Sequence, residues 1–476
     1  MTWRSTLLFV VLSVQWCLAS DDGDKAALAT SIEKQADAYW NLARQIWDWA
    51  EPGYQEEKSS ALLASYLEQA GFSVEMGVAE IPTAFVASFG SGKPVIGILA
   101  EFDALPGLAQ EVAPERRPRA GSNGYGHGCG HHLFGTASTA AAIALAEQIK
   151  AGRLQGTVRL YGTPAEEGGS AKVFMARAGV FDDCDAVLHW HPGDENAAGD
   201  ATCLARIAVK FRFHGYSAHA AGAPEQGRSA LDAVTLTNHA AELLREHTPD
   251  FTRIHYVITS GGGAPNVVPN YAEVFYYVRH PDAAVVQELY QRLLKCAQAS
   301  ALATETRLEV EYLGGTYNIL PNRTLSEIML RNLRELADLE YTEEERAFAL
   351  ALQKTLKSPK PLESIQEVRD RRGQLTKGST DVGDVSWVVP TTGLTAATWV
   401  PGVPAHSWQA VACGGMSIGK KGMLLAAKAL AATAWDLYQD PQTLQAAKAE
   451  LIGRRAGKRY EPMLQPGQKP PLDYRK

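Results

Sequence analysis

Short apolar, β-branched runs alternate with helical patterns over the first half of this chain, and this alternation is the strongest constraint on its fold. The expected strands are residues 94–100, 157–161 and 186–189, and the expected helices are 131–150 and 170–178. Strands and helices that alternate in this way form a mostly parallel sheet flanked by helices, the α/β class. Two helices over 25–50 and 58–70 are expected to precede the first strand, because apolar residues recur there at three- and four-residue spacing.

The pattern changes at Arg206. From there a strand, a helix, two strands, a helix and a strand are expected over residues 207–213, 229–246, 254–259, 272–279, 283–301 and 307–313. This β-α-β-β-α-β order is that of a ferredoxin-like α+β unit. We therefore expect a large α/β domain in two parts, 20–205 and 317–476, with a small domain, 206–316, inserted between them.

The first 19 residues predict a signal peptide. Arg4 provides a cationic start, residues 7–14 form an apolar stretch, and Cys17-Leu18-Ala19 is a small-residue cleavage site. The apolar stretch is shorter than the roughly 20 residues that span a bilayer, which favours a cleaved signal over a membrane anchor. The mature chain is then expected to begin near Ser20 and to be secreted or periplasmic. Asn322-Arg323-Thr324 is a glycosylation sequon, which matters only in a eukaryotic host.

Charge and cysteine content exclude several classes of protein. Lys and Arg number 46 against 53 Asp and Glu, a net charge of −7, so the chain lacks the basic excess that nucleic acids and anionic membranes attract. We expect neither as a partner. The 6 Cys are too few and too scattered for a disulfide scaffold or a paired CxxC metal ribbon. A Cys with a chemical role must therefore act singly.

Groups that bind metals or move protons follow the ends of the expected strands. They lie in the segments 100–106, 163–169, 188–192 and 398–406, and a fifth segment, 126–132, lies at the start of the Ala-rich helix. Open α/β sheets bind ligands beyond the carboxyl ends of their strands, where the loops converge. The five segments therefore predict one shared site.

Cys129 and His131 are the first candidate metal ligands. Cys129 is flanked by glycines at the start of a helix, where the helix dipole favours a thiolate. A turn at Gly130 can aim both side chains at one centre. A buried structural thiol is the alternative for Cys129, and His127 and His132 fit a supporting or surface role better than a ligand role.

Two pairs of residues leave an assignment open. Glu166-Glu167 follows a strand and precedes two glycines, so one carboxylate can bind metal while the other acts as general base on a water. A solvated helix start is the alternative reading of this pair. His189 and His191 point to the same face of an extended chain, so either could complete the ligand set. His406 is the remaining candidate.

Three other classes are weaker. The segment 215–219 is not a Gly-x-Ser-x-Gly elbow and no triad order is evident, which disfavours a serine hydrolase. The segment 90–93 lacks the spacing of a phosphate-binding loop, which disfavours a nucleotide-binding enzyme. A catalytically silent protein that only binds its ligand would not need Glu166 together with every type of metal ligand.

These segments resemble those of the M20 family of metal-dependent amidohydrolases and peptidases. The resemblance covers nearly the whole mature chain and is closest to the branch that contains the B subunit of aminobenzoyl-glutamate hydrolase (utilization protein), beside aminoacylases and auxin-conjugate hydrolases. It lies in Glu101-Phe102-Asp103-Ala104-Leu105-Pro106, Gly126-His127-Gly128-Cys129-Gly130-His131, Pro164-Ala165-Glu166-Glu167-Gly168-Gly169, Trp190-His191-Pro192, Ala218-His219-Ala220, Ala264-Pro265-Asn266-Val267-Val268-Pro269 and Ser379-Thr380-Asp381-Val382-Gly383-Asp384-Val385-Ser386.

The resemblance implies two divalent metal ions per subunit, Zn²⁺ or Mn²⁺. The residues that match the family's metal site are Cys129 as the bridge, Glu167 and His406 at one ion, and His131 and His191 at the other. Glu166 matches the general base, and Asp103 matches a carboxylate that orients a ligand histidine. His132 stands where many relatives have Asp, so no role is carried over for that position.

The resemblance also implies that residues 206–316 form a lid and dimerisation domain. His219 matches a histidine that reaches into the partner subunit's site and stabilises the oxyanion. Asn266 and Arg279 match groups that hold the substrate carboxylate. Arg279 ends a strand, and its forked donors suit a carboxylate. A surface salt bridge is the alternative role for it.

We therefore expect an enzyme, a metal-dependent amidohydrolase. It would cleave the amide bond of an N-acyl amino acid, with p-aminobenzoyl-glutamate as the first substrate to test, through a water that Glu166 activates. A dipeptidase or small-peptide carboxypeptidase of the same family is the alternative. A homodimer through residues 206–316 is expected, with association with a homologous subunit as a second option.

Overall fold

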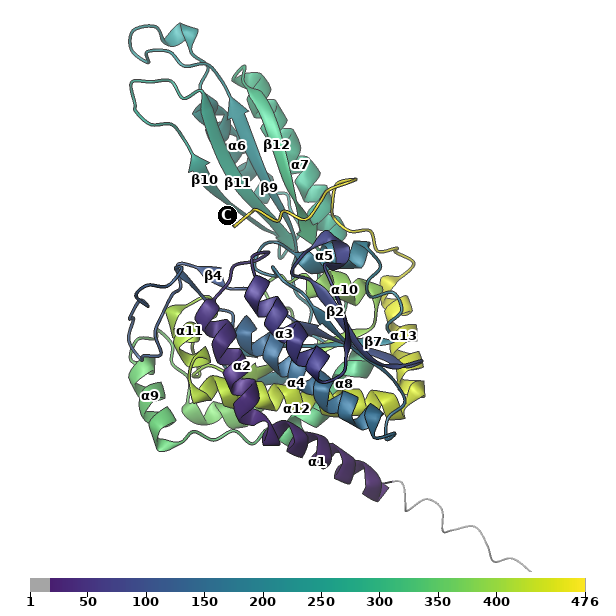
Figure 1. The fold of residues 1–476 in the computed structure, drawn as a ribbon. Coiled ribbons are helices and arrows are strands. Elements are labelled where there is room, and N and C mark those ends of the chain that lie inside the picture. Colours follow the sequence, from purple (N-terminus) through teal and green to yellow (C-terminus); the bar gives the residue numbers. More distant parts are fainter. Residues whose placement is uncertain (1–17, 476) are drawn as a thin grey trace, which may run out of the picture.

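The computed structural model describes residues 18–475, and the predicted signal peptide, 1–19, lies almost wholly outside them. A large α/β body carries a smaller sheet, which stands on it at one end (Figure 1). Within the described part of the chain, no helix is both long and apolar enough for a membrane crossing.

The large body is built on an eight-stranded sheet in the order β1-β2-β6-β3-β7-β14-β8-β13. Its four central strands are parallel: β6 (Gly156–Gly162), β3 (Val95–Ala100), β7 (Ala186–Gly193) and β14 (Thr391–Ala397). The α/β class is confirmed. The sheet is nevertheless mixed, because β1 (Ser73–Met76), β2 (Phe85–Ser91) and β8 (Asn196–Ala198) each have an antiparallel neighbour. At the far edge, β13 (Val368–Asp370) pairs in parallel with β8.

Helices cover both faces of the large sheet. α4 (His131–Lys150), α8 (Arg323–Leu336) and α12 (Ser417–Gln439) pack on one face, while α5 (Ala171–Arg177) and α10 (Val382–Val388) lie between the large sheet and the small one (Figure 1). The other helices are α9 (Glu343–Gln353), α11 (Trp408–Gly414) and α13 (Pro441–Arg455).

The helix expected over 25–50 is two helices, α1 (Leu18–Lys34) and α2 (Ala36–Trp49), followed by α3 (Glu57–Gln69). The chain turns at Gln35, where the main packing partner of the helices changes. α1 packs chiefly on α12, whereas α2 packs on α4 and α3. A break of this kind depends on the partners of each helix, which local apolar spacing does not reveal.

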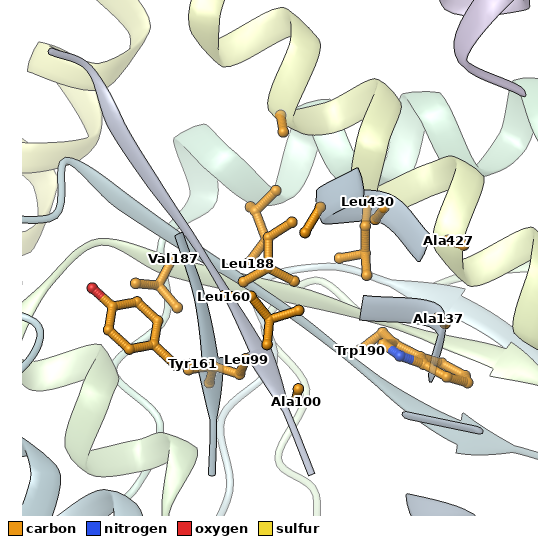
Figure 2. Close-up of a cluster of buried hydrophobic side chains, with 14 of the residues drawn as sticks. Leu99, Ala100, Ala137, Leu160, Tyr161, Val187, Leu188, Trp190, Ala427 and Leu430 are labelled. Atoms are coloured by element: carbon orange, nitrogen blue, oxygen red, sulfur yellow. The ribbon is translucent and has the colours of Figure 1, made fainter. Parts of the chain in front are cut away.

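The core between the sheet and its helices holds the central strands in place. Figure 2 shows Leu188 of β7 beside Leu430 of α12, and Trp190 of β7 beside Ala137 of α4. All four side chains are fully buried. Small alanines on α4 and α12 let these helices approach the sheet closely, and a close-packed interior resists displacement. The carboxyl ends of the parallel strands are therefore rigid supports.

The smaller sheet has four antiparallel strands in the order β10-β11-β9-β12. Along the chain they are β9 (Ala205–His214), β10 (Arg253–Ser260), β11 (Tyr271–His280) and β12 (Arg307–Thr316), with α6 (Ala230–Arg245) and α7 (Ala283–Ala303) packed on one face. β9 begins at the large body, and the loops 215–229 and 261–270 lie at the opposite end of the sheet.

The sequon residue Asn322 is buried. Its side chain caps α8 by accepting a hydrogen bond from the Leu325 amide at 3.1 Å, and it donates to the Ala447 carbonyl at 2.9 Å. Only 3% of Asn322 is exposed, so the folded protein leaves no room for a glycan at this position.

Candidate metal centre

A thiol, three imidazoles and several carboxylates meet at the carboxyl ends of the central strands. Potential ligand atoms lie within 4.8 Å of one another in three groups: Cys129 with His131 and His191; Cys129 with Glu167 and His406; and Glu101 with His131 and Glu166. The first two groups share Cys129. The structure therefore brings together the five residues that the resemblance implied as ligands, in two sets joined by one sulfur.

The start of α4 places Cys129 and His131 on the same side. Gly130 precedes the helix with a φ of 79°, and a Cβ there would lie 2.7 Å from the Cβ of Pro192. Glycine is therefore the residue that allows this left-handed, close turn. The turn brings the sulfur of Cys129 to 3.3 Å from Nε2 of His191.

Hydrogen bonds at Nδ1 orient two of the imidazoles. His131 donates from Nδ1 to the Asp103 carboxylate at 2.7 Å, and His191 donates from Nδ1 to the Pro192 carbonyl at 2.7 Å. Because Nδ1 of each ring is engaged in this way, Nε2 is the nitrogen left to bind a cation. Asp103 also accepts from the amide of Glu167 at 2.8 Å, so one buried carboxylate links two candidate ligands.

The residues present fit divalent cations. Within residues 18–475, Glu101 Oε2, His131 Nε2 and Glu167 Oε1 are buried without a well-oriented hydrogen bond, although His131 Nε2 lies 3.1 Å from Glu101 Oε2. Burial raises the pKa of the Cys129 thiol well above its usual value, so a thiolate there needs a compensating positive charge. Sulfur, imidazole and carboxylate ligands suit Zn²⁺, and the carboxylates also suit Mn²⁺.

The pKa values of Glu166 and Glu167 are shifted in opposite directions although the two residues are neighbours. Burial, followed by the charges of Glu101 and Glu167, raises the pKa of Glu166 well above its usual value. Burial acts in the same direction on Glu167, but the His406 ring, 3.1 Å away, and the charge of His131 hold its pKa below the usual value. The two carboxyls therefore differ in their affinity for a proton, and Glu166 is the one better suited to take up and release a proton.

Strained backbone surrounds these carboxylates. Ala165 and Ser170 flank the loop that carries Glu166 and Glu167, and they have φ values of 54° and 56°; His406 has a φ of 58°. Residues other than glycine hold such conformations only where the surrounding structure enforces them. The loop is therefore held in a defined shape.

A cavity of about 1140 Å³ opens beside the cluster, between the large body and the small sheet. Arg279 lines it, as does Arg206, its cross-strand neighbour on β9. Their guanidinium carbons lie 5.4 and 4.9 Å from the centre of the Tyr277 ring. Both Nε atoms are buried without a hydrogen-bond partner, and neither side chain forms an ion pair within residues 18–475. The cavity therefore has a wall suited to anions.

The sequence did not predict Arg206 as a site residue, because its place in the cavity wall depends on the strand register that sets it opposite Arg279. The choice between His189 and His191 was also open. His191 lies against Cys129, whereas the His189 ring packs on Gly393 of β14, where a Cβ would lie 2.4 Å from its Nε2.

His127 and His132 are not at the surface. Both are fully buried, and their rings lie 4.8 Å apart beside the start of α4. His127 bonds through Nε2 to the Ile46 carbonyl at 3.1 Å, and His132 to the Gly414 carbonyl at 3.0 Å. They tie α4 to its neighbours and belong to none of the three ligand groups.

His219 and Asn266 do not reach the cavity of their own chain. They lie together in the loops at the far end of the small sheet, where the amide of Ala220 donates to the Asn266 carbonyl at 2.9 Å. Both side chains are exposed, and neither lines the cavity. Within this chain, these two residues therefore do not contribute to the site.

Fold and site together define a metal-dependent hydrolase: an α/β body with clustered sulfur, imidazole and carboxylate ligands beneath a ferredoxin-like unit. The sequence profile of the peptidase family M20/M25/M40 matches residues 97–353. The chain is 43% identical over 447 residues to the B subunit of the p-aminobenzoyl-glutamate hydrolase of Escherichia coli (strain K12), covering 88% of this chain and 93% of that one.

One further relative and one solved structure are consistent with this family. The chain is 31% identical to the Xaa-Arg dipeptidase of Mus musculus, over 90% of this chain and 92% of that one. An aminobenzoyl-glutamate utilization protein from Klebsiella pneumoniae has the same fold, with a TM-score of 0.61 at 19% identity over 87% of this chain and 99% of that one. The chain belongs to the peptidase family M20/M25/M40.

Proposed function

We propose that this protein hydrolyses the amide bond of N-acyl amino acids, with p-aminobenzoyl-glutamate as the leading substrate. The observation that carries the substrate class is the pair Arg206 and Arg279 in the cavity wall, which has no carboxylate partner within residues 18–475. Two neighbouring guanidinium groups of this kind suit a ligand with two carboxylates, such as a glutamate. The similarity to the B subunit of a p-aminobenzoyl-glutamate hydrolase supports the same substrate.

Five residues would hold two divalent cations: Cys129 between them, His131 and His191 on one side, and Glu167 and His406 on the other. Bound there, the ions would polarise the amide carbonyl and lower the pKa of a water. Glu166 lies beside this cluster and takes the proton of the attacking water. It then delivers that proton to the leaving nitrogen. Asp103 keeps the His131 ring in its binding orientation.

A panel of amides tests the activity. We expect the metal-loaded protein to release p-aminobenzoate from N-(p-aminobenzoyl)-L-glutamate faster than from the alanine analogue, as measured by chromatography. Glu166→Gln should lower kcat by about 10²- to 10⁴-fold while metal content is unchanged. Equal rates on both amides would refute the dicarboxylate preference, and normal turnover by Glu166→Gln would refute the mechanism.

A dipeptide is the second candidate substrate, favoured by the similarity to an Xaa-Arg dipeptidase. The same panel should therefore contain dipeptides that end in Arg and in Glu. Faster cleavage of a dipeptide than of every N-aminobenzoyl amino acid would replace the leading proposal.

We further propose that the active protein is a dimer in which His219 completes the partner's site. The edge strand β10 carries exposed apolar side chains, Tyr256, Val257 and Ile258, which a second chain could cover. In a dimer with shared sites, His219→Ala and Glu166→Gln should each be inactive alone. Mixing them should restore about a quarter of the wild-type activity, because half of the dimers are mixed and hold one complete site. No recovery after subunit exchange would refute shared sites.

Association with a homologous subunit is the alternative assembly, since the similar Escherichia coli protein is named as one of the subunits of its hydrolase. Sedimentation of the purified chain separates the two: a stable homodimer supports the first proposal, and an inactive monomer supports the second. The N-terminal pattern supports a further proposal, export from the cytoplasm, and N-terminal sequencing of the mature protein near Ser20 tests it.

A further inference from the structure

The segment 456–475, which follows α13, crosses from the large body to the small sheet and back (Figure 1). On the small sheet, the Met463 carbonyl accepts hydrogen bonds from the Gly315 amide at 2.9 Å and the Tyr312 hydroxyl at 3.2 Å. The side-chain amide of Gln468 donates to the Leu313 carbonyl at 3.2 Å. These contacts fasten the segment along the base of β12.

The same segment is also bound to the large body. The Tyr460 hydroxyl donates to Asp384 at 2.9 Å, Arg177 donates to the Gln468 carbonyl at 2.6 Å, and Gln55 donates to the Leu472 carbonyl at 2.9 Å. The segment therefore spans the junction between the two sheets, at the edge of the substrate cavity.

Its last two described residues bind the loop that carries the catalytic carboxylates. The Tyr474 hydroxyl and Nη2 of Arg475 both donate to the Glu167 carbonyl, at 3.3 and 2.9 Å. The Tyr474 ring also packs edge-on against Tyr54, with centroids 5.7 Å apart, and the Tyr54 hydroxyl donates to the Gly169 carbonyl at 2.8 Å. The carbonyls of Glu167 and Gly169, on either side of Gly168, are thus both held by hydrogen bonds.

The amide of Glu167 is held separately, because it donates to the Asp103 carboxylate at 2.8 Å. The peptide units on both sides of Glu167 are therefore fixed, and with them the direction of its carboxylate. Arg475 also lines the cavity, and its Nε is buried with no hydrogen-bond partner. Within residues 18–475 Arg475 forms no ion pair, so its charge faces the cavity, the Glu167 carbonyl and the Tyr474 ring, whose centre lies 5.0 Å from its guanidinium carbon.

We propose that Arg475 is a positioning residue of the active site. Through the Glu167 carbonyl it holds the Glu166–Glu167 loop in its working shape, and Tyr474 assists it. The segment 456–475 is then part of the catalytic apparatus, although it lies about 300 residues from the loop it supports. This inference rests on the proposed function in one respect, namely that Glu166 and Glu167 serve the reaction.

Three variants test the proposal on the full chain, with the best substrate of the wild-type protein. Arg475→Ala should lower kcat about 10- to 100-fold, because small displacements of catalytic groups have effects of that size. Arg475→Lys keeps a cationic donor for the Glu167 carbonyl and should recover most of this loss. The matched control, Arg177→Ala, removes an exposed contact to the same segment away from the cavity, and kcat should be unchanged.

A second measurement does not depend on activity. Hydrogen exchange of the amides in the loop 165–170 should be faster in Arg475→Ala than in the wild-type protein, and unchanged in Arg177→Ala. Normal kcat with normal exchange in Arg475→Ala would overturn the proposal. An equal loss of kcat in all three variants would also overturn it, because it would show general loosening of the segment.

The two proposals fail in different ways. If the proposed function is wrong, the wild-type protein itself does not cleave N-acyl amino acids. If the role of Arg475 is wrong, wild type and Arg475→Ala behave alike on whichever substrate is cleaved and in hydrogen exchange.

Discussion

Replacing Asp103 by Asn should weaken metal binding because it changes which nitrogen of His131 carries the proton. The side-chain volume stays almost the same. Burial disfavours the charged form of Asp103, but His131 and two hydrogen bonds hold its pKa below the usual value, so it is a carboxylate. An Asn can still accept from the Glu167 amide, but its NH₂ group cannot accept the proton on Nδ1 of His131. The His131 proton then moves to Nε2, which is the nitrogen that faces the cluster.

The size of the effect follows from this one contact. Partners that orient a ligand histidine are worth about 10- to 100-fold in metal affinity. Each tenfold corresponds to about 1.4 kcal/mol, so the loss should be about 1.4 to 2.8 kcal/mol for the ion at His131. Competition with a fluorescent chelator gives this dissociation constant directly, and titration with added metal shows whether activity returns at saturation.

Glu56→Gln is the matched control. Glu56 is also fully buried beside this site, where it accepts from the Ala165 amide at 2.8 Å and from the Thr83 hydroxyl at 3.1 Å. Burial, followed by the charge of Asp103, raises the pKa of Glu56 well above its usual value. Its raised pKa favours the neutral form, which Gln resembles, so Gln should replace Glu56 with little loss of metal affinity. Wild-type metal affinity in Asp103→Asn, or an equal loss in Glu56→Gln, would refute this reasoning.

Three further outcomes are expected. Arg206→Ala should raise KM for an N-acyl glutamate about tenfold or more and leave KM for the alanine analogue nearly unchanged, which steady-state kinetics on both amides measures. Burial raises the pKa of Asp384 to about 8. Its contribution to stability is therefore present below the unfolded pKa of about 4 and is lost as pH rises to about 8. Urea unfolding at several pH values should show that the free energy of unfolding falls more steeply with pH in the wild-type protein than in Asp384→Asn. Chelator treatment should lower the melting temperature and abolish hydrolysis, because the buried thiol and carboxylates lose their compensating charge. Added Zn²⁺ or Mn²⁺ should restore both the melting temperature and the hydrolysis.

Strong local patterns made much of the fold predictable. The limits expected for the helix at 131–150 match α4, and β3 and β6 lie within one residue of their expected limits, because these segments are continuously apolar or strongly periodic. The short strands β1, β8 and β13, at or next to the edges of the large sheet, were not predicted. They have only three or four residues each, and their pairing comes from distant strands whose position no local pattern encodes.

Candidate site residues were predictable where chemistry is concentrated in short segments. Cys129, His131 and the pair Glu166-Glu167 stand among glycines at strand or helix ends, and such a context is visible in a sequence. Arg206 carries no such context. It becomes meaningful only because β9 pairs with β11 in a register that sets it beside Arg279.

The amino-acid sequence alone determined the fold class, the metal-binding character of the strand ends and the family. Only the tertiary structure decided that His191 and not His189 lies against Cys129, which of two adjacent glutamates has the raised pKa, and that Arg475 holds the Glu167 carbonyl. The physical reason is the distance along the chain over which each kind of signal acts. Residue type and periodicity act over a few positions, whereas desolvation, charge and hydrogen bonding act between atoms a few ångströms apart that are separated by tens to hundreds of residues along the chain.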